Sequence, residues 1–155
     1  MPAKIVSLPD LLRRLKRHRG KVLVFTNGCF DILHYGHVKY LEAAKKKGDI
    51  LIVGMNTDAS VRRLKGPGRP VTPEKERAAI LAALACVDYV TLFAEDTPLR
   101  LIEAVRPDVL VKGRDWKKTE IVGARFVSAR GGRVLTVPLV KNRSTTGLLK
   151  RIKTL

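Results

Sequence analysis

The sequence predicts a single α/β domain in which helices cover both faces of a five-stranded parallel sheet. Three observations support this fold class. Short apolar runs alternate five times with amphipathic stretches along the 155 residues. The runs are rich in Val, Ile and Leu, as expected for strands that are buried on both faces. Hydrophobic residues make up 45% of the chain, which is enough for one compact core.

Periodicity and a helix-stop residue define the first elements of the chain. Residues 21–26 and 50–55 are continuous apolar runs and predict two buried strands. Between them, residues 35–47 carry apolar side chains at helical spacing, and Gly48 can end that helix. A further helix over residues 8–18 would precede the first strand.

Caps and prolines define the elements in the middle of the chain. Residues 57–64 predict a short helix, which either Thr57 or Asp58 can cap. The Gly- and Pro-rich segment 65–70 breaks regular structure and predicts a loop. A threonine and a proline follow, which fits a cap before proline at the first helical position and predicts a helix over residues 73–85.

The second half of the chain continues the same alternation. We expect strands at 88–93, 109–111 and 133–137, helices at 97–106 and 144–152, and a weaker helix that ends before Gly131. This order predicts a doubly wound, Rossmann-like domain at residues 21–155, preceded by an N-terminal helical extension at residues 1–20. In such folds ligands bind beyond the carboxyl ends of the strands, so the turn after the first strand is the first place to look for chemistry.

Composition narrows the classes of function. The net charge is +17, which raises nucleic acid and anionic small molecules as partners. The basic residues are scattered and do not alternate with aromatic residues, which argues against nucleic acid and favours a solvated surface. Cys29 and Cys86 fit no disulfide or metal pattern and indicate a reduced, cytoplasmic setting. No apolar run is long enough to span a bilayer, so no membrane partner is expected.

The turn after the first strand lacks both familiar glycine-rich phosphate fingerprints, which argues against a dehydrogenase and a P-loop enzyme. It carries instead His34 and His37, three residues apart at the start of the next helix, where both rings should face the same way. Backbone N–H groups at a helix start attract anions, and imidazoles beside them can donate to phosphate.

Gly36 lies between the two histidines and would leave room for a flat base against the backbone. Two other interpretations of this pair are open. The histidines could be ordinary surface or core residues, or they could bind a metal ion. No third metal ligand is evident nearby, so we predict no protein metal site.

Residues 34–37 resemble the HxGH signature of the nucleotidyltransferase superfamily, and residues 144–146 resemble its second nucleotide-binding motif. Within it, the chain is similar to the D-glycero-β-D-manno-heptose 1-phosphate adenylyltransferases at residues 26–31, 56–58, 64–70, 96–98, 111–115 and 142–146. In many bacteria this domain is fused behind a sugar kinase, and this chain looks like the stand-alone form. One departure from the heptose pattern is Arg114-Asp115-Trp116, where glycine and then Asp-Tyr are expected. Asp-Trp at this place is more like the glycerol-3-phosphate cytidylyltransferases.

The resemblance implies transfer of AMP from ATP to a sugar 1-phosphate, giving an ADP-sugar and pyrophosphate. It implies a phosphate-bridging Mg²⁺ ion and a homodimer. His34 and His37 would hold the ATP phosphates and stabilise the departing pyrophosphate. The implied nucleotide-binding residues are Asn27, Gly28, Cys29, Phe30, Gly36, Lys65, Asn142, Arg143, Ser144 and Thr145. The implied acceptor-binding residues are Asp58, Arg69, Lys112 and Asp115.

Several of these residues have a second interpretation. The Phe30 side chain is expected to pack in the core, with only its backbone beside the nucleotide. Asp31 could orient a histidine or cap the turn, and Asp58 could cap a helix. Arg77, with two glutamates nearby on its helix, is interpreted as a salt-bridged surface residue. Ser144 could simply cap the last helix.

Three alternative functions stay open. A cytidylyltransferase for glycerol 3-phosphate and an adenylyltransferase for FMN belong to the same superfamily. A basic nucleic-acid-binding module belongs to a different class and would explain the charge, but not the two nucleotide-binding motifs.

Overall fold

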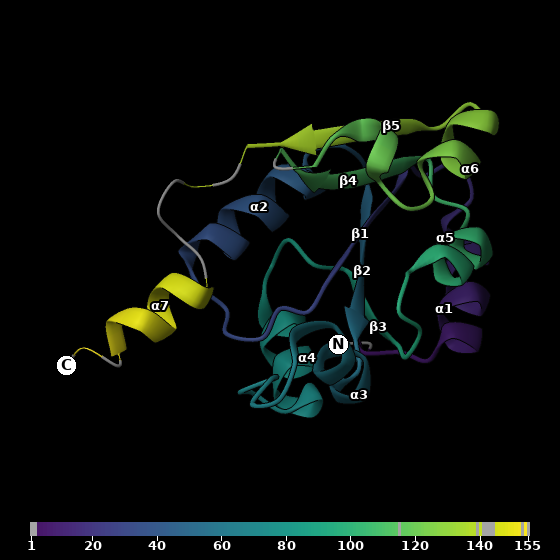
Figure 1. The fold of residues 1–155 in the computed structure, drawn as a ribbon. Helices are drawn as coiled ribbons and strands as arrows, with labels where there is room; N and C mark the ends of the chain where they lie inside the picture. The colour runs from purple at the N-terminus through teal and green to yellow at the C-terminus, as the bar shows by residue number, and fades with distance from the viewer. Residues whose placement is uncertain (1–2, 115, 139, 141–144, 153, 155) are drawn as a thin grey trace.

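The computed structural model describes residues 3–114, 116–138, 140, 145–152 and 154, and it confirms the expected α/β fold class (Figure 1). One sheet contains the strands β1 (Leu23–Gly28), β2 (Ile50–Asn56), β3 (Tyr89–Phe93), β4 (Val109–Gly113) and β5 (Arg133–Val137). The strand order is β3-β2-β1-β4-β5, and every neighbouring pair is parallel. The switch point of the doubly wound sheet therefore lies between β1 and β4.

Helices cover both faces of this sheet, as the sequence predicts. They are α1 (Leu8–Leu15), α2 (Tyr35–Lys45), α3 (Asp58–Lys65), α4 (Glu74–Ala83), α5 (Leu99–Val105), α6 (Ala124–Ala129) and α7 (Thr145–Ile152), with 3₁₀ turns η1 (Lys16–His18) and η2 (Lys118–Glu120). Helices α2 and α4 contribute Leu41 and Leu81 to one hydrophobic core. Helices α1 and α5 contribute Leu11 and Ile102 to the other. Figure 1 shows α7 extending away from these layers.

The strands divide their side chains between the two cores. Val24 packs on the side of α2 and α4, and the next residue, Phe25, packs on the side of α1 and α5. Both side chains are fully buried. Burial on both faces explains why β1 and β2 are continuous apolar runs without alternating polar residues.

The sheet splits at its switch point, and this split creates the space for a ligand. Strand β1 pairs with β2 along its whole length. It pairs with β4 only at Val24 and Phe25, opposite Val109 and Leu110. Beyond Phe25 the two strands are bridged by side chains instead, because the Tyr40 hydroxyl donates to the Val111 carbonyl at 3.1 Å. The carboxyl ends of β1 and β4 therefore form the two walls of an opening.

Several element boundaries differ by one to three residues from those expected from the sequence, and two of them have a clear physical reason. Strand β1 continues to Asn27 and Gly28, which pair with Gly54 and Met55 of β2. Main-chain pairing needs no apolar side chain, so the end of the apolar run was a poor guide to the end of the strand. Pro73 is the N-cap of α4 and not its first helical residue.

The segment before β1 packs onto the sheet. Ile5 forms a parallel bridge with Val90 of β3, and Leu11 is fully buried in the same core as Phe25. The division of the chain at residue 20 stays a prediction.

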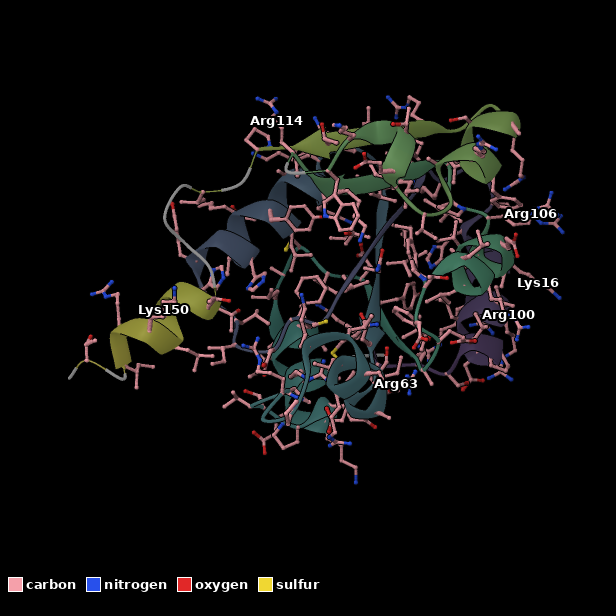
Figure 2. All side chains as sticks on the ribbon, in the orientation of Figure 1. Lys16, Arg63, Arg100, Arg106, Arg114 and Lys150 are labelled. Carbon is pink, nitrogen blue, oxygen red and sulfur yellow. The ribbon has the colours of Figure 1, made fainter. Side chains whose placement is uncertain are left out.

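Figure 2 shows Lys16, Arg63 and Lys150 on different sides of the molecule, so the positive charge is spread. None of the described helices has the length and apolar character that a bilayer-spanning helix requires.

Candidate active site

A cleft occupies the opening between the carboxyl ends of β1 and β4. Its larger lobe has a volume of about 720 Å³, and a smaller lobe of about 400 Å³ extends over His34 and Gly36. Both lobes are lined by the same shared set: Asn27, Gly28, Cys29, Phe30, His37, Lys65, Lys112, Trp116 and Thr145. The two lobes therefore form one continuous site at the place that the fold class predicts.

The two histidines lie together at the start of α2. His34 is the N-cap residue in an extended conformation, and His37 is in the first helical turn, where its N–H donates to the His34 carbonyl at 2.9 Å. Their rings stack with centroids 3.9 Å apart and planes 28° from parallel. The expectation that both rings face the same way is confirmed.

His37 is held as a neutral imidazole. Burial and, to a smaller extent, the neighbouring His34 together lower its pKa from 6.5 to about 4. Its Nδ1 atom is buried and has no hydrogen-bond partner among the described residues. A neutral ring that lies in a cleft and is not yet fully hydrogen-bonded can bind an anionic oxygen, which would favour its protonated form.

The turn that leads to these histidines is tightly shaped. Phe30 has a positive φ of 46°, a left-handed conformation that is uncommon for a bulky residue. Its ring lies in the core, with an edge-on contact to His37 at 5.5 Å between centroids. The expected core position of the Phe30 side chain is confirmed. A Cβ atom on Gly28 would lie 3.1 Å from the same ring, so glycine suits that position.

Arg77 holds this turn through a hydrogen bond to the Cys29 carbonyl. The interpretation of Arg77 as a surface residue is wrong. Its side chain is 0% exposed. Its guanidinium donates to the carbonyl of Cys29, to the carbonyl of Thr72 at 3.0 Å, and to Asp58 Oδ1 at 2.6 Å. The nearby glutamates suggested a surface pair, but Arg77 pairs with an aspartate from another helix.

Asp58 belongs to the same structural network. Its Oδ1 accepts from Arg77, and its Oδ2 accepts from the backbone N–H of Glu74 at 3.1 Å. Among the described residues that line either lobe of the cleft, Asp58 is absent. The structure thus places Asp58 as a cap of α4, which corrects its assignment to acceptor binding, because the protein already uses both carboxylate oxygens. Thr57 is the residue that caps α3.

The loop between α3 and α4 carries cations over the larger lobe. Lys65 ends α3, and Arg69 follows in the loop; both line the cleft. Arg69 Nε donates to Asp31 Oδ2 at 2.6 Å. Among the described residues, the hydrogen bonds of Asp31 go to this loop and not to a histidine or to its own turn.

The opposite wall comes from β4 and the segment after it. Lys112 Nζ donates to the Asn27 carbonyl at 3.1 Å, which ties β4 to β1 across the split. The same ammonium lies 5.8 Å from the centroid of the Trp116 ring, which is half-exposed in the cleft. Lys112 is thus positioned by the main chain and an aromatic face, with its charge at the cleft.

Sequence reasoning missed several lining residues. They are Asn56, Leu64, Asp96, Thr97, Pro98, Trp116, Ile121 and Val122. Asn56, Asp96 and Trp116 follow or end strands, where ligands are expected, and residues 56–58 and 96–98 carry part of the family resemblance, but the sequence assigned no binding role to these three side chains. The apolar members carry no such signal, because Ile121 and Val122 resemble any other core residue.

The C-terminal part of the predicted site is only partly described. Asp115, Asn142, Arg143 and Ser144 lie outside the described residues. Thr145 begins α7, lines both lobes, and lies with Oγ1 3.5 Å from the Ile32 carbonyl. Thr145 thus lies at the cleft, and its role in nucleotide binding stays a prediction.

The carboxylates of the cleft are already used by the protein. Asp31 accepts from the loop, and Asp96 accepts from Arg63 Nε at 2.8 Å. In the described part of the chain, no group of three or more His, Cys, Asp or Glu residues could hold a metal ion. This donor set fits a Mg²⁺ ion that is held by substrate phosphates and water rather than by a protein cage.

A parallel α/β sheet with stacked histidines at its switch point and cations on both walls of the cleft defines a nucleotidyltransferase. The chain belongs to the cytidylyltransferase-like family, whose model matches residues 25–145.

Curated relatives agree with this family. The chain is 58% identical over 146 residues to the bifunctional protein HldE of Syntrophotalea carbinolica, covering 94% of this chain and 30% of the relative. It is 55% identical over 151 residues to the bifunctional protein HldE of Pseudomonas paraeruginosa, covering 96% and 32%. The chain thus spans about a third of the length of the curated relatives it matches.

Solved structures agree as well. The lipopolysaccharide core biosynthesis protein from Thermoplasma volcanium is 31% identical, with a TM-score of 0.63, and the match covers 80% of this chain and all of that one. Pantothenate synthetase from Thermus thermophilus matches at a TM-score of 0.59 over 96% of this chain and 70% of that one. Its identity of 19% means that it supports the fold alone.

Proposed function

We propose that this chain transfers AMP from ATP to a sugar 1-phosphate, with D-glycero-β-D-manno-heptose 1-phosphate as the acceptor, and releases pyrophosphate. The observation that carries the proposal is the stacked pair of His34 and His37 at the N-terminus of α2, inside a cleft with cationic walls. The relatives are named bifunctional, and this chain matches about a third of each. A neighbour in lipopolysaccharide core biosynthesis agrees with a sugar acceptor.

The reaction would be an in-line displacement. An anionic phosphate oxygen of the acceptor attacks the α-phosphorus of ATP, while the bond from that phosphorus to the bridging oxygen breaks. The electron pair of the broken bond leaves with pyrophosphate. The attacking oxygen carries no proton, so no general base is required. Catalysis then depends on positioning and on neutralising the charge that grows on the leaving group.

The residues of the smaller lobe suit the triphosphate. His34, His37 and the N-terminal N–H groups of α2 would donate to its oxygens. The charge of pyrophosphate would raise the pKa of His37 from its low value in the free protein, since an adjacent anion stabilises the imidazolium. Mg²⁺ carried by the phosphates would neutralise part of their charge.

The larger lobe suits the acceptor. Arg69 lines this lobe, and Lys112 and Trp116 form part of its wall. Two cations can bind the acceptor phosphate, and an aromatic side chain can cover one face of a sugar or base. This division assigns the acceptor to the side of the cleft away from His34.

A screen of pyrophosphate release tests the proposal. ATP and CTP would each be offered with heptose 1-phosphate, glycerol 3-phosphate and FMN. ATP with heptose 1-phosphate should give the highest kcat/KM. Turnover with CTP and glycerol 3-phosphate alone would replace the proposed reaction with the alternative that the Asp115-Trp116 pair suggests. Release with ATP and FMN alone would favour the flavin alternative.

A cytoplasmic location and a homodimer stay predictions, and light scattering of the purified chain would measure its mass in solution.

Nucleic-acid binding also stays the weaker alternative. Figure 2 shows Lys16, Arg63 and Lys150 on different sides of the molecule, which does not favour one concentrated basic face for a duplex. Titration with DNA or RNA in rising salt would measure any such binding, and sequence-selective binding at physiological salt would favour that function.

A further inference from the structure

The loop between α3 and α4 is held in place over the cleft by one buried carboxylate. Asp31 comes from the turn after β1, and its side chain is 2% exposed. Its Oδ1 accepts from the backbone N–H groups of Val71 at 2.8 Å and Thr72 at 3.0 Å, and its Oδ2 accepts from Arg69 Nε at 2.6 Å. A carboxylate can be this buried because its oxygens are hydrogen-bonded and its charge is paired.

The same two segments are joined a second time by Arg77. This buried guanidinium donates to the carbonyl of Cys29 in the turn and to the carbonyl of Thr72 at the end of the loop. Arg77 therefore holds the loop at its carboxyl end without help from Asp31. Of the three hydrogen bonds that Asp31 accepts, the one from Arg69 reaches the cleft, because the Arg69 side chain is 21% exposed and lines the larger lobe.

The pairing with Asp31 leaves part of the Arg69 guanidinium for a ligand. The bond uses the Nε–H group, and no other hydrogen bond from Arg69 is present within the described residues. The terminal amino groups carry the remaining donors, in a planar arrangement that matches a phosphate. Fixing one edge of the guanidinium reduces the side-chain entropy that binding would otherwise cost.

We propose that Asp31 is a positioning residue that fixes Arg69 to receive the phosphate of the acceptor in the larger lobe, and so sets the affinity for the acceptor rather than for ATP. The inference rests on the proposed function for the identity of the acceptor. The choice of acceptor over triphosphate follows from the location of Arg69, which lines the larger lobe but is not among the described residues that line the lobe over His34.

A double-mutant cycle tests this coupling. Asp31→Asn keeps an oxygen for the N–H groups of Val71 and Thr72 but places an amide donor against Arg69 Nε. Arg69→Gln removes the cation. Each single change should raise the KM for heptose 1-phosphate roughly 10-fold, as for loss of a charge-assisted hydrogen bond. Because Asp31 acts through Arg69, the double variant should be no worse than Arg69→Gln.

Nucleotide affinity is the second readout. The dissociation constant of ATP without acceptor, measured by calorimetry, should change less than about two-fold in all three variants. Arg62→Gln is the matched control, because Arg62 is an exposed arginine of α3 that lines neither lobe. This control should leave both the KM and the ATP affinity unchanged.

Two kinds of result would overturn the proposal. One is an unchanged acceptor KM in Arg69→Gln, which also decides the matter if Asp31→Asn fails to fold. The other is an additive loss in the double variant, or an equal loss of ATP affinity, since either would mean that Asp31 supports the fold generally.

Calorimetric titration with heptose 1-phosphate separates this proposal from the proposed function. Binding that depends on Arg69 but gives no turnover would count against the reaction and in favour of the positioning role. If another acceptor turns over instead, the cycle is run with that acceptor, and only the assigned sugar is wrong. No binding and no turnover with any acceptor would overturn both.

Discussion

The hydroxyl of Tyr40 in α2 lies 2.6 Å from Oγ1 of Thr26 in β1, at the level where β1 and β4 stop pairing. The same hydroxyl donates to the carbonyl of Val111 in β4. One side chain therefore bridges the two strands just below the cleft. The site needs the strands to separate, and Tyr40 gives the Val111 carbonyl of β4 and the Thr26 hydroxyl of β1 a partner where the two strands no longer pair.

Tyr40→Phe should lower the free energy of unfolding by about 1–3 kcal/mol. The change leaves the Thr26 hydroxyl and the Val111 carbonyl buried without this partner, and unsatisfied polar groups carry that cost. Urea denaturation measures the difference. Tyr35→Phe is the control, because Tyr35 is 58% exposed at the start of the same helix. Equal stability of the two variants would show that the bridge contributes nothing.

Arg77→Met should be among the most destabilising changes in the chain, at about 3–5 kcal/mol. The side chain is fully buried, and removing it leaves Asp58 without its cation and two carbonyls without their donor. Methionine keeps most of the volume, so the loss would report the polar network rather than a cavity.

An exposed arginine provides the comparison for Arg77. Arg13→Met breaks a surface pair with Asp10 and should cost less than about 1 kcal/mol. Thermal melts of the two variants, measured side by side, decide the matter. Comparable melting temperatures would mean that the Arg77 network is not a determinant of stability.

Some features of this fold and site could be predicted from the sequence, and the location of Arg77 could not. The strands and the facing histidines follow from local patterns, because apolar runs and a spacing of three residues have direct geometric consequences. Arg77 could not be predicted in the same way. Its partners Asp58 and Cys29 are 19 and 48 residues distant in the chain, and the close glutamates suggested a surface location.

Asp31, at the site itself, also has partners that are distant in the sequence. Its partners Arg69, Val71 and Thr72 lie 38 to 41 residues away. The sequence pointed to Asp31 as a turn cap or a partner of a histidine, because those residues are its neighbours along the chain. Only the folding of the α3–α4 loop back over the turn makes it a partner of that loop. Contacts between distant loops leave no periodic signal.

His37 should make the stability of the protein depend on pH between about 6.5 and 4. Its folded-state pKa is lowered to about 4 by burial, so the unfolded chain takes up the proton first as the pH falls. The stability due to the neutral ring is complete above pH 6.5 and is lost on acidification through this window. The loss should amount to about 2 kcal/mol after allowance for the partial exposure of the ring.

Urea denaturation of the wild type and of His37→Gln across this range measures the effect. The neutral glutamine cannot titrate, so the difference in unfolding free energy between the two proteins should shift with pH in favour of the variant at low pH. Parallel pH profiles would mean that His37 titrates normally in the folded protein.

His37→Ala should lower kcat on the order of 100-fold, because it removes one preorganised donor to the phosphates of the leaving group. The remaining histidine of the chain provides the matched control. His18 contacts Tyr89 at 2.9 Å and lines neither lobe of the cleft, so His18→Ala should keep near-normal turnover. Pyrophosphate release under saturating ATP and acceptor measures kcat, and circular dichroism checks that both variants are folded. A folded His37→Ala protein with wild-type turnover would remove His37 from the reaction. The stacked pair would then be a structural feature of the α2 N-terminus, and the charge of the leaving group would have to be stabilised by other groups of the cleft, such as Lys65 and Lys112.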